Sequence, residues 1–486
     1  MKNLKKILKN IISEIRIDKI IGSIDLDFNE LQFDSRKVGA KDIFFALKGT
    51  QTDGHEFIDS VIEQGAAAII CSELPSNQPS DVVFLKVENT AKALAFFAAE
   101  YYEQPTKKIK LVGVTGTNGK TTIATLLYNL TRKFNYKCGL ISTINYIVHE
   151  KETDSSHTTP DVLTINKLLS EMIHEGCKYC FMEVSSHALV QERVTGLDFA
   201  GAIFTNLTHD HLDYHTDFAH YRDAKKLLFD NLKGKAFALV NSDDKNGKFM
   251  LQNTKANKYT FGLTSFSNFK AKILEKRIDG TLLEIENLEV WIQFLGDFNA
   301  SNLLAVYAAA TLLGEVPKEQ VLREISSLTP VRGRFETLKL KNGSVAIIDY
   351  AHTPDALENV LQTIDKLRTS QQNVITVVGA GGNRDKTKRP IMARIAGQYS
   401  NKVILTSDNP RNEEPSAILS DMETGILYEH KNKYSIIENR REAIETAVFM
   451  AKANDIILVA GKGHETYQEI KGIRHHFDDK EIVLNS

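Results

Sequence analysis

The residues with the clearest chemical meaning lie in one short stretch, Lys110 to Thr122, which reads KLVGVTGTNGKTT. An apolar run leads into a turn with Gly116 and Gly119, and a Lys-Thr-Thr triplet begins at Lys120. Glycine lets the backbone approach a ligand closely, and backbone N–H groups at a helix N-terminus attract phosphate. Lysine adds positive charge and a hydroxyl can hold Mg²⁺. The stretch therefore predicts a phosphate-binding loop for ATP or GTP.

The spacing of this loop departs from the strict pattern, which has Gly six residues before the lysine, where this chain has Val114. A tight glycine turn beside a surface lysine is the alternative interpretation. The context favours phosphate, because an apolar strand precedes the loop and a helical apolar pattern follows it at Ile123, Leu126, Leu127 and Leu130.

A second group of polar residues has the chemistry of a metal site. His209, Asp210, His211, Asp213 and His215 follow the predicted strand 202–206. Such residues often only cap and turn a chain, but beside a nucleotide loop they favour a divalent cation, and Glu183 at another strand end offers a hard oxygen ligand. Lys225 and Lys226 follow on a helix, and spacing alone does not separate them.

Size and composition restrict the class of protein. A chain of 486 residues predicts two to four domains, and a net charge of −2 gives no field that would attract nucleic acid. The four cysteines are too few for a disulfide framework and fit a reducing cytosol. Cys177 and Cys180 have redox or zinc spacing without a second pair, so we interpret them as buried thiols.

The N-terminus is basic and amphipathic, with Leu4, Ile7, Leu8, Ile11 and Ile15 on one helical face. It lacks the features of a signal peptide, and the chain has no apolar run of about 18 residues that would predict a membrane span. A membrane-surface helix is one interpretation. An ordinary first helix that packs on its own domain is the one we favour.

The elements that position these residues alternate between strands and helices along the whole chain. Short strands end in polar loops throughout, and 103–106 and 329–334 read as linkers. Alternation at Phe269 to Phe294 around Asp279-Gly280 predicts a hairpin, and Asn299 to Leu313 a helix. Since ligands of open α/β sheets bind at the carboxyl ends of strands, Glu183 and the 205–215 loop are expected to join Lys120 in one cleft.

Several motifs occur together in one order along nearly the whole chain: Gly116–Thr121, Glu183–His187, Thr205–Asp213, Gly296–Asn302, Arg332–Arg334 and Asp349–His352. This set resembles the Mur ligases, the ATP-dependent amino-acid ligases of peptidoglycan precursor synthesis. Four further motifs resemble the members that add the third amino acid: Asp34–Arg36, His157–Pro160, Asp408–Arg411 and Gly461–Glu465.

The resemblance implies an α/β fold of three domains. These are an N-terminal α/β domain for the UDP-sugar (1–107), a central P-loop ATPase-like parallel-sheet domain (108–332) and a C-terminal Rossmann-like α/β domain for the amino acid (333–486). It also implies a cytoplasmic monomer that acts in cell wall biogenesis, cell shape and cell division, without a nucleic-acid or membrane partner.

The implied reaction adds meso-diaminopimelate to UDP-MurNAc-L-Ala-D-Glu through an acyl phosphate, with ATP and Mg²⁺. The resemblance assigns catalysis to Lys120, Glu183, His211 and Lys225, with a carbamate on Lys225, which it favours over Lys226. The metal ligands would be Thr121, Glu183, His211 and Lys225. The nucleotide residues would be Gly116, Thr117, Asn118, Gly119, Lys120, Thr121, Thr122, Asn299, Arg334 and Asp349.

The same resemblance assigns the UDP-sugar dipeptide to Ser35, Thr158, Thr159, Ser185, Gln191 and Arg193. His157 stands where the family often has Asn, so its contact stays open. Diaminopimelate would contact Arg384, Asp408, Asn409, Pro410, Arg411, Gly461 and Glu465. The guanidinium of Arg411 suits a distal carboxylate and repels the terminal ammonium of lysine.

Four alternatives remain open at this level. The same ligase could add L-lysine, or the chain could be another Mur ligase or a folylpolyglutamate synthase-like enzyme. A nucleotide-switched binding protein without ligase chemistry is the alternative from another class. The Ser35 loop, the 408–411 motif and the polar cluster beside Lys120 argue against these readings.

Overall fold

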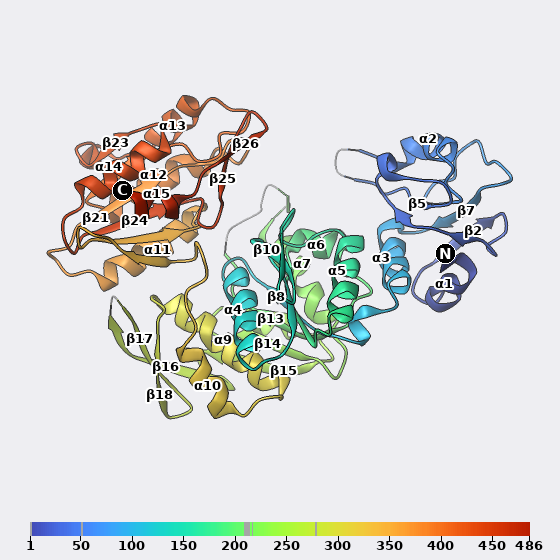
Figure 1. The fold of residues 1–486 in the computed structure, drawn as a ribbon, viewed down its shortest axis with the longest axis horizontal. Coiled ribbons are helices and arrows are strands. Elements are labelled where there is room, and N and C mark those ends of the chain that lie inside the picture. Colours follow the sequence, from blue (N-terminus) through green and yellow to red (C-terminus); the bar gives the residue numbers. More distant parts are fainter. Residues whose placement is uncertain (1, 50–51, 209–213, 216, 278) are drawn as a thin grey trace.

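The computed structural model describes residues 2–49, 52–208, 214–215, 217–277 and 279–486. Figure 1 shows three regions along the longest axis, with the central region between the N-terminal one (blue) and the C-terminal one (orange to red). Each region has its own main sheet, of five, eleven and six strands in chain order. The predicted α/β class is confirmed.

The N-terminal sheet has the order β2-β7-β6-β5-β4, with β2 antiparallel to β7 and the others parallel. Helix α1 buries Leu4, Ile7, Leu8 and Ile11 in the core of this region, so the prediction of a packed first helix is confirmed. Ile15 is buried too, but it lies beyond the end of that helix. The bounds are β1 Lys2–Asn3, α1 Leu4–Ile11, β2 Ile17–Ile21, β3 Asp27–Phe28, β4 Leu31–Gln32, β5 Ile43–Phe45, α2 Ile58–Glu63, β6 Ala68–Cys71, β7 Val83–Val87 and α3 Thr90–Tyr101.

The central sheet has the order β11-β10-β9-β12-β8-β13-β14-β15-β16-β17-β18. The seven neighbouring strands β9, β12, β8, β13, β14, β15 and β16 pair in parallel, as predicted. Antiparallel strands extend the sheet at both edges, β10 and β11 at one and β17 and β18 at the other. The hairpin expected around Asp279-Gly280 is β16–β17. The strands are β8 Lys110–Thr115, β9 Cys138–Ile141, β10 Asn145–Val148, β11 Lys151–Asp154, β12 Tyr179–Glu183, β13 Phe199–Phe204, β14 Phe237–Asn241, β15 Asn257–Gly262, β16 Phe269–Arg277, β17 Gly280–Ile285 and β18 Leu288–Ile292.

Helices cover both faces of this sheet, because strands buried on two faces need apolar partners on each side. One core cluster contains α4 and α9 with one sheet face, and a second contains α5 and α7 with the other. Cys177 and Cys180 are buried free thiols, as expected. The helices are α4 Lys120–Lys133, α5 Val162–His174, α6 Ser186–Val190, α7 Phe218–Asp230, α8 Gly247–Met250, α9 Asp297–Leu313 and α10 Lys318–Ser326.

The C-terminal sheet has the order β19-β20-β24-β21-β22-β23, parallel except for β19. Its central strands β21 and β24 are buried throughout and apolar except for Thr376, which is typical of a doubly covered parallel sheet. The bounds are β19 Glu336–Lys339, β20 Val345–Asp349, α11 Pro354–Leu367, β21 Val374–Val378, α12 Lys388–Tyr399, β22 Lys402–Leu405, α13 Pro415–Glu423, β23 Tyr434–Ile436, α14 Arg440–Met450, β24 Ile456–Ala460, β25 Tyr467–Ile470, β26 Ile473–His476 and α15 Asp479–Asn485.

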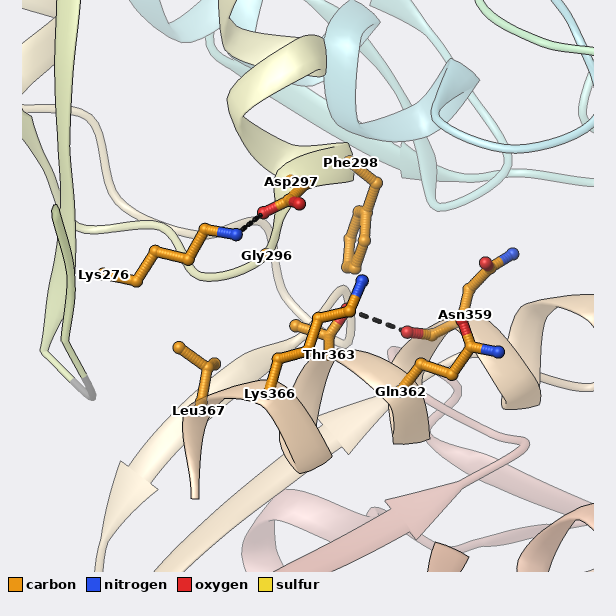
Figure 2. Close-up of a pocket in the computed structure, with 9 residues that line it drawn as sticks. All are labelled: Lys276, Gly296, Asp297, Phe298, Asn359, Gln362, Thr363, Lys366 and Leu367. Atoms are coloured by element: carbon orange, nitrogen blue, oxygen red, sulfur yellow. Dashed lines mark hydrogen bonds and ion pairs between the residues drawn. The ribbon is translucent and has the colours of Figure 1, made fainter. Parts of the chain in front are cut away.

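The central and C-terminal regions meet where the start of α9 faces α11. A cavity of about 120 Å³ lies at this junction. Figure 2 shows its lining side chains, with Asp297 pointing toward Lys276 and Phe298 lying over Thr363. The ring of Phe298 also packs edge-on against Phe335. In the part of the chain that is described, no helix has both the length and the apolar composition needed to cross a membrane.

Candidate active site

A large cleft of about 830 Å³ lies between the central and C-terminal regions. Its lining includes the predicted phosphate loop, the ends of the central strands β12 and β13, and the 408–411 loop of the C-terminal region. The carboxyl ends of strands from two separate sheets therefore face one space, as the rule for open α/β sheets leads one to expect.

The phosphate loop connects β8 to α4, as the sequence predicted. Gly116 and Gly119 have positive φ angles of 148° and 88°. A Cβ on Gly116 would lie 1.8 Å from Thr205 Oγ1, and one on Gly119 would lie 2.6 Å from Asn302 Oδ1. Both positions therefore require glycine, for the backbone angle and for the space.

The lysine of this loop folds back over it. Lys120 Nζ donates to the carbonyl oxygens of Gly116 at 2.9 Å and Thr117 at 2.7 Å. The backbone N–H of Asn118 donates to Asn206 Oδ1 at 2.9 Å, which ties the loop to the end of β13. Thr117, Asn118, Gly119, Lys120, Thr121 and Thr122 line the cleft. The loop thus presents an ammonium group and a helix N-terminus to the same space, which is the arrangement that attracts a phosphate chain.

Glu183 at the end of β12 is fully buried and is held by three donors. Its carboxylate accepts hydrogen bonds from Thr121 Oγ1 at 3.1 Å, and from the backbone N–H and Oγ1 of Thr143 at 2.7 and 3.1 Å. Arg334 Nη2 donates to Thr121 Oγ1 at 3.1 Å. Thr143 was not predicted from the sequence, because only the parallel pairing of β9 with β12 brings this residue, just after β9, beside Glu183.

The structure separates the two adjacent lysines of α7. Lys225 is 1% exposed, lines the cleft and donates from Nζ to the Gly116 carbonyl at 2.9 Å. Its ammonium lies 4.5 Å from the ring centre of Tyr221. Lys226 points elsewhere, to Asp230 and to the Gln252 carbonyl. One helical residue corresponds to about 100° of rotation, so only one of the two can face the loop.

Most of the predicted histidine cluster, including His211, falls on residues 209–213, which lie outside the described part of the chain. His215 is described and is buried. Its Nε2 lies 2.9 Å from Ser186 Oγ, and its ring packs near His187 and Tyr221. Among the described residues, no group of three or more His, Cys, Asp or Glu side chains has the spacing of a metal site.

Two expected nucleotide residues lie on the C-terminal side of the cleft. The Asp349 carboxylate accepts hydrogen bonds from the backbone N–H groups of Phe335 at 2.6 Å and Ala351 at 2.8 Å. Burial raises the pKa of Asp349 to about 6, although the nearby Arg334 opposes this shift. The Arg334 guanidinium lies 4.4 Å from the ring centre of Tyr350. Asn299 is buried at the start of α9, lines the cleft and donates to the Leu295 carbonyl.

The residues expected to hold the UDP-sugar dipeptide divide into two places. Thr158, Thr159, Ser185 and Arg193 line the cleft. Arg193 Nη1 donates to the Thr159 carbonyl at 2.7 Å, Nε and Nη2 donate to Gln191 Oε1, and burial lowers the pKa of Arg193. Gln191, which accepts these hydrogen bonds from Arg193, is not part of the cleft lining. Ser35 lies in the N-terminal region and is not part of the lining either.

The residues expected to hold the amino acid surround one end of the cleft. Arg384, Asp408, Asn409, Arg411, Gly461 and Glu465 line it, and Pro410 lies in the same loop outside the lining. Arg411 Nη1 donates to the Gly382 carbonyl at 2.7 Å, and its Nε lies 3.8 Å from Glu469 Oε2. None of the described residues accepts a hydrogen bond from Arg411 Nη2. A cationic fork therefore faces the cleft with one nitrogen available to a ligand.

Asp355 connects the two regions through a contact that was not predicted from the sequence. Asp355, in the first turn of α11, accepts hydrogen bonds from Asn118 Nδ2 at 3.1 Å and Thr208 Oγ1 at 3.0 Å. The two regions are thus joined at the phosphate loop itself. No local pattern could have indicated this contact, because Asn118 and Asp355 are 237 residues apart.

Fold and cleft together define a three-region α/β protein with a phosphate-binding loop at a junction of two sheets. Three family models match the chain: "Mur ligase family, catalytic domain" over residues 27–102, "Mur ligase middle domain" over 114–310 and "Mur ligase, glutamate ligase domain" over 333–463. These matches include the segments that carry most of the cleft. The chain belongs to the Mur ligase family.

Relatives of known name span the whole chain. It is 56% identical over 476 residues to the UDP-N-acetylmuramoyl-L-alanyl-D-glutamate--2,6-diaminopimelate ligase of Phocaeicola vulgatus, covering 98% of each chain. It is 53% identical to the ligase of the same name from Bacteroides fragilis, again with 98% of each chain. A solved structure of a ligase with this name has a TM-score of 0.70 at 31% identity, covering 99% of this chain and 98% of that one.

Proposed function

We propose that this protein is an ATP-dependent ligase that adds meso-2,6-diaminopimelate to UDP-MurNAc-L-Ala-D-Glu. The observation that carries the proposal is the single cleft that contains both the phosphate loop with Lys120 and the pocket with Arg411. A ligase of this kind needs phosphoryl chemistry and amino-acid recognition within reach of each other. The relatives above carry the name of this activity over the full length of the chain.

ATP would bind with its phosphates on the loop 116–122, its base near Asn299 and its ribose near Asp349. Lys120 and Arg334 would neutralise the charge that grows when a substrate carboxylate approaches the γ-phosphoryl group. The D-Glu γ-carboxylate oxygen forms a bond to the γ-phosphorus as the bond to the β-phosphate oxygen breaks, and ADP leaves. The diaminopimelate amine then attacks the acyl carbon, loses a proton, and phosphate leaves.

A magnesium ion fits the oxygen groups at the start of α4. Thr121 Oγ1 and the buried Glu183 carboxylate lie 3.1 Å apart, and a buried carboxylate with hydroxyl neighbours has the hard-ligand chemistry that Mg²⁺ prefers. Together with His211 these residues would hold the ion, which would supply positive charge to the phosphates. Thr121 orients the carboxylate, and Arg334 orients Thr121.

A carbamate also fits Lys225. The amine is buried against the phosphate loop and the Tyr221 ring, so replacing its cation with an anion would turn the side chain into an oxygen ligand facing the cleft. The three domains would have the bounds 1–107, 108–332 and 333–486. We further propose a cytoplasmic monomer, in which Ser35 and Gln191 reach the UDP-sugar together with Thr158, Thr159, Ser185 and Arg193.

Phosphate release with ATP, Mg²⁺ and UDP-MurNAc-L-Ala-D-Glu tests the proposal, run separately with meso-diaminopimelate, L-lysine and no amino acid. Release that requires diaminopimelate supports the ligase and its specificity. Release that requires lysine keeps the ligase and refutes the specificity. Release that does not depend on any amino acid indicates a nucleotide-switched protein and refutes the ligase.

A further inference from the structure

A buried lysine stands directly behind the amino-acid end of the cleft. Lys462 is 0% exposed and lies outside the lining, whereas its two partners, Asn409 and Glu465, belong to it. Lys462 Nζ donates to Asn409 Oδ1 at 3.0 Å and to Glu465 Oε2 at 2.9 Å. Its ammonium also lies 5.4 Å from the ring centre of Tyr467. A buried ammonium with this set of partners is held in one position.

These contacts determine which way the Asn409 amide faces. Its Oδ1 accepts from Lys462 Nζ and from the backbone N–H of Glu469 at 2.9 Å, and its Nδ2 donates to Glu465 Oε2 at 2.8 Å. A flipped amide would place its NH₂ group against two other donors and its oxygen against a carboxylate. Since the amide nitrogen carries two hydrogens, the second one is the group that Asn409 can offer to a ligand.

The same lysine determines the charge of the pocket. The described contacts of the Glu465 carboxylate go to Oε2, from Asn409 and Lys462. Lys462 and Glu465 together have no net charge, so Glu465 does not offset the positive charge that Arg384 and Arg411 bring to this end of the cleft. Glu469 Oε2 lies 3.8 Å from Arg411 Nε. Without Lys462, an unbalanced carboxylate would face the ligand.

We infer that Lys462 is a positioning residue for amino-acid specificity, acting through Asn409 and Glu465. It turns an amide N–H toward the cleft and balances Glu465, so that the pocket prefers a distal end with both a carboxylate and an ammonium to one with an ammonium alone. The inference rests on the proposed function and deepens it. Lysine ends in an ammonium alone, so the loss of Lys462 must weaken diaminopimelate binding and favour lysine relative to it.

The variant Lys462→Met tests this, because it keeps the length of the side chain and removes its charge. Loss of an amide anchor in a charged hydrogen-bond network should raise the KM for meso-diaminopimelate about tenfold or more. The KM for ATP and the kcat should stay within twofold, and the diaminopimelate-to-lysine ratio of kcat/KM should fall. The matched control is Lys452→Met, an exposed lysine of the same region outside the cleft lining.

A partly buried carboxylate that has lost its partner can destabilise a protein, so a second comparison uses Glu465→Gln with and without Lys462→Met. Neither of these variants leaves Glu465 charged and unpaired. The double variant should have a diaminopimelate-to-lysine ratio about tenfold below that of Glu465→Gln alone, since the two variants differ only in what Lys462 supplies, which is the anchoring of Asn409 and a positive charge.

Equal ratios in this comparison, or a Lys462→Met variant in which the KM values of all three substrates rise together, would overturn the inference. Both results leave diaminopimelate turnover by the unaltered protein intact. If the unaltered protein fails to turn over diaminopimelate, the proposed function is refuted, and this inference with it.

Discussion

Replacing Arg411 by alanine removes a guanidinium group from the amino-acid end of the cleft, where Arg384 also lies. The Arg411 side chain is 25% exposed, and it already contacts the Gly382 carbonyl and Glu469. An ion pair between Arg411 and a ligand carboxylate would therefore be only partly shielded from water. A hydrogen bond between charged groups contributes about 1.5–3 kcal/mol, which corresponds to about a 10–150-fold loss of kcat/KM for meso-diaminopimelate.

The backbone at Arg411 should keep its conformation when alanine replaces the side chain. Arg411 has a φ of 52°, which is unfavourable for any residue with a Cβ, so alanine adds no new strain at this position. Its backbone N–H and carbonyl hold Glu469 and Lys471 independently of the side chain. The loop should therefore keep its path, and thermal unfolding should show less than a few degrees of change.

The assay is phosphate release with varied meso-diaminopimelate, L-lysine or ATP, for the unaltered protein, Arg411→Ala and Arg411→Lys. Diaminopimelate turnover should fall, lysine turnover should stay equal or rise, and the KM for ATP should not change. Arg411→Lys should recover only part of the loss, because an ammonium lacks the two parallel donors. An equal fall with both amino acids would refute the reasoning, since Arg411 would then act through the loop.

Three further predictions concern other parts of the molecule. Because burial raises the pKa of Asp349 to about 6, the acceptor form is lost as pH falls through this value. The KM for ATP should therefore rise about tenfold between pH 7 and pH 5. In Asp349→Asn the KM should not change over this range, and a rise equal to that of the unaltered protein would contradict the prediction. Arg440 and Asp479 form an ion pair with both side chains 0% exposed, so Asp479→Asn should lower the free energy of unfolding in urea by about 3–5 kcal/mol, whereas an unchanged midpoint would show that the pair is not structural. Gly116→Ala should reduce phosphate release about 100-fold, because its Cβ would meet Thr205 Oγ1 at 1.8 Å; near-normal activity would mean that the loop can shift.

The sequence predicted those parts of the fold that local patterns determine. The apolar run before Gly116 and the helical pattern after Lys120 correspond to β8 and α4 because a buried strand and an amphipathic helix have different periods. The Asp279-Gly280 turn correctly predicted β16–β17. The antiparallel edge strand β11 was missed, because it is exposed along its length and has no apolar pattern. Its partner β10 is largely buried but only four residues long, and it was missed as well.

The sequence indicated which residues belong to the candidate site, but it did not indicate which of them contact one another. Spacing left Lys225 and Lys226 equivalent, and only the rotation of α7 against the phosphate loop separates them. The contact of Asp355 with Asn118 depends on how two regions pack, which no periodicity encodes. Lys462 occurs in a motif that the sequence analysis quoted, but its burial behind Asn409 could be seen only in three dimensions.

The residues for phosphate chemistry and those for amino-acid recognition come from two different sheets. The phosphate loop, Glu183 and Lys225 come from the central region, whereas Arg411, Asn409 and the buried lysine behind them come from the C-terminal one. Residues that share no partners contribute nearly independently to a free energy. Changes at Arg411 or Lys462 should therefore alter which amino acid is chosen and leave the phosphate chemistry intact. Asp355 is the exception, because it belongs to the C-terminal region and holds Asn118 of the phosphate loop, so a change there should affect both.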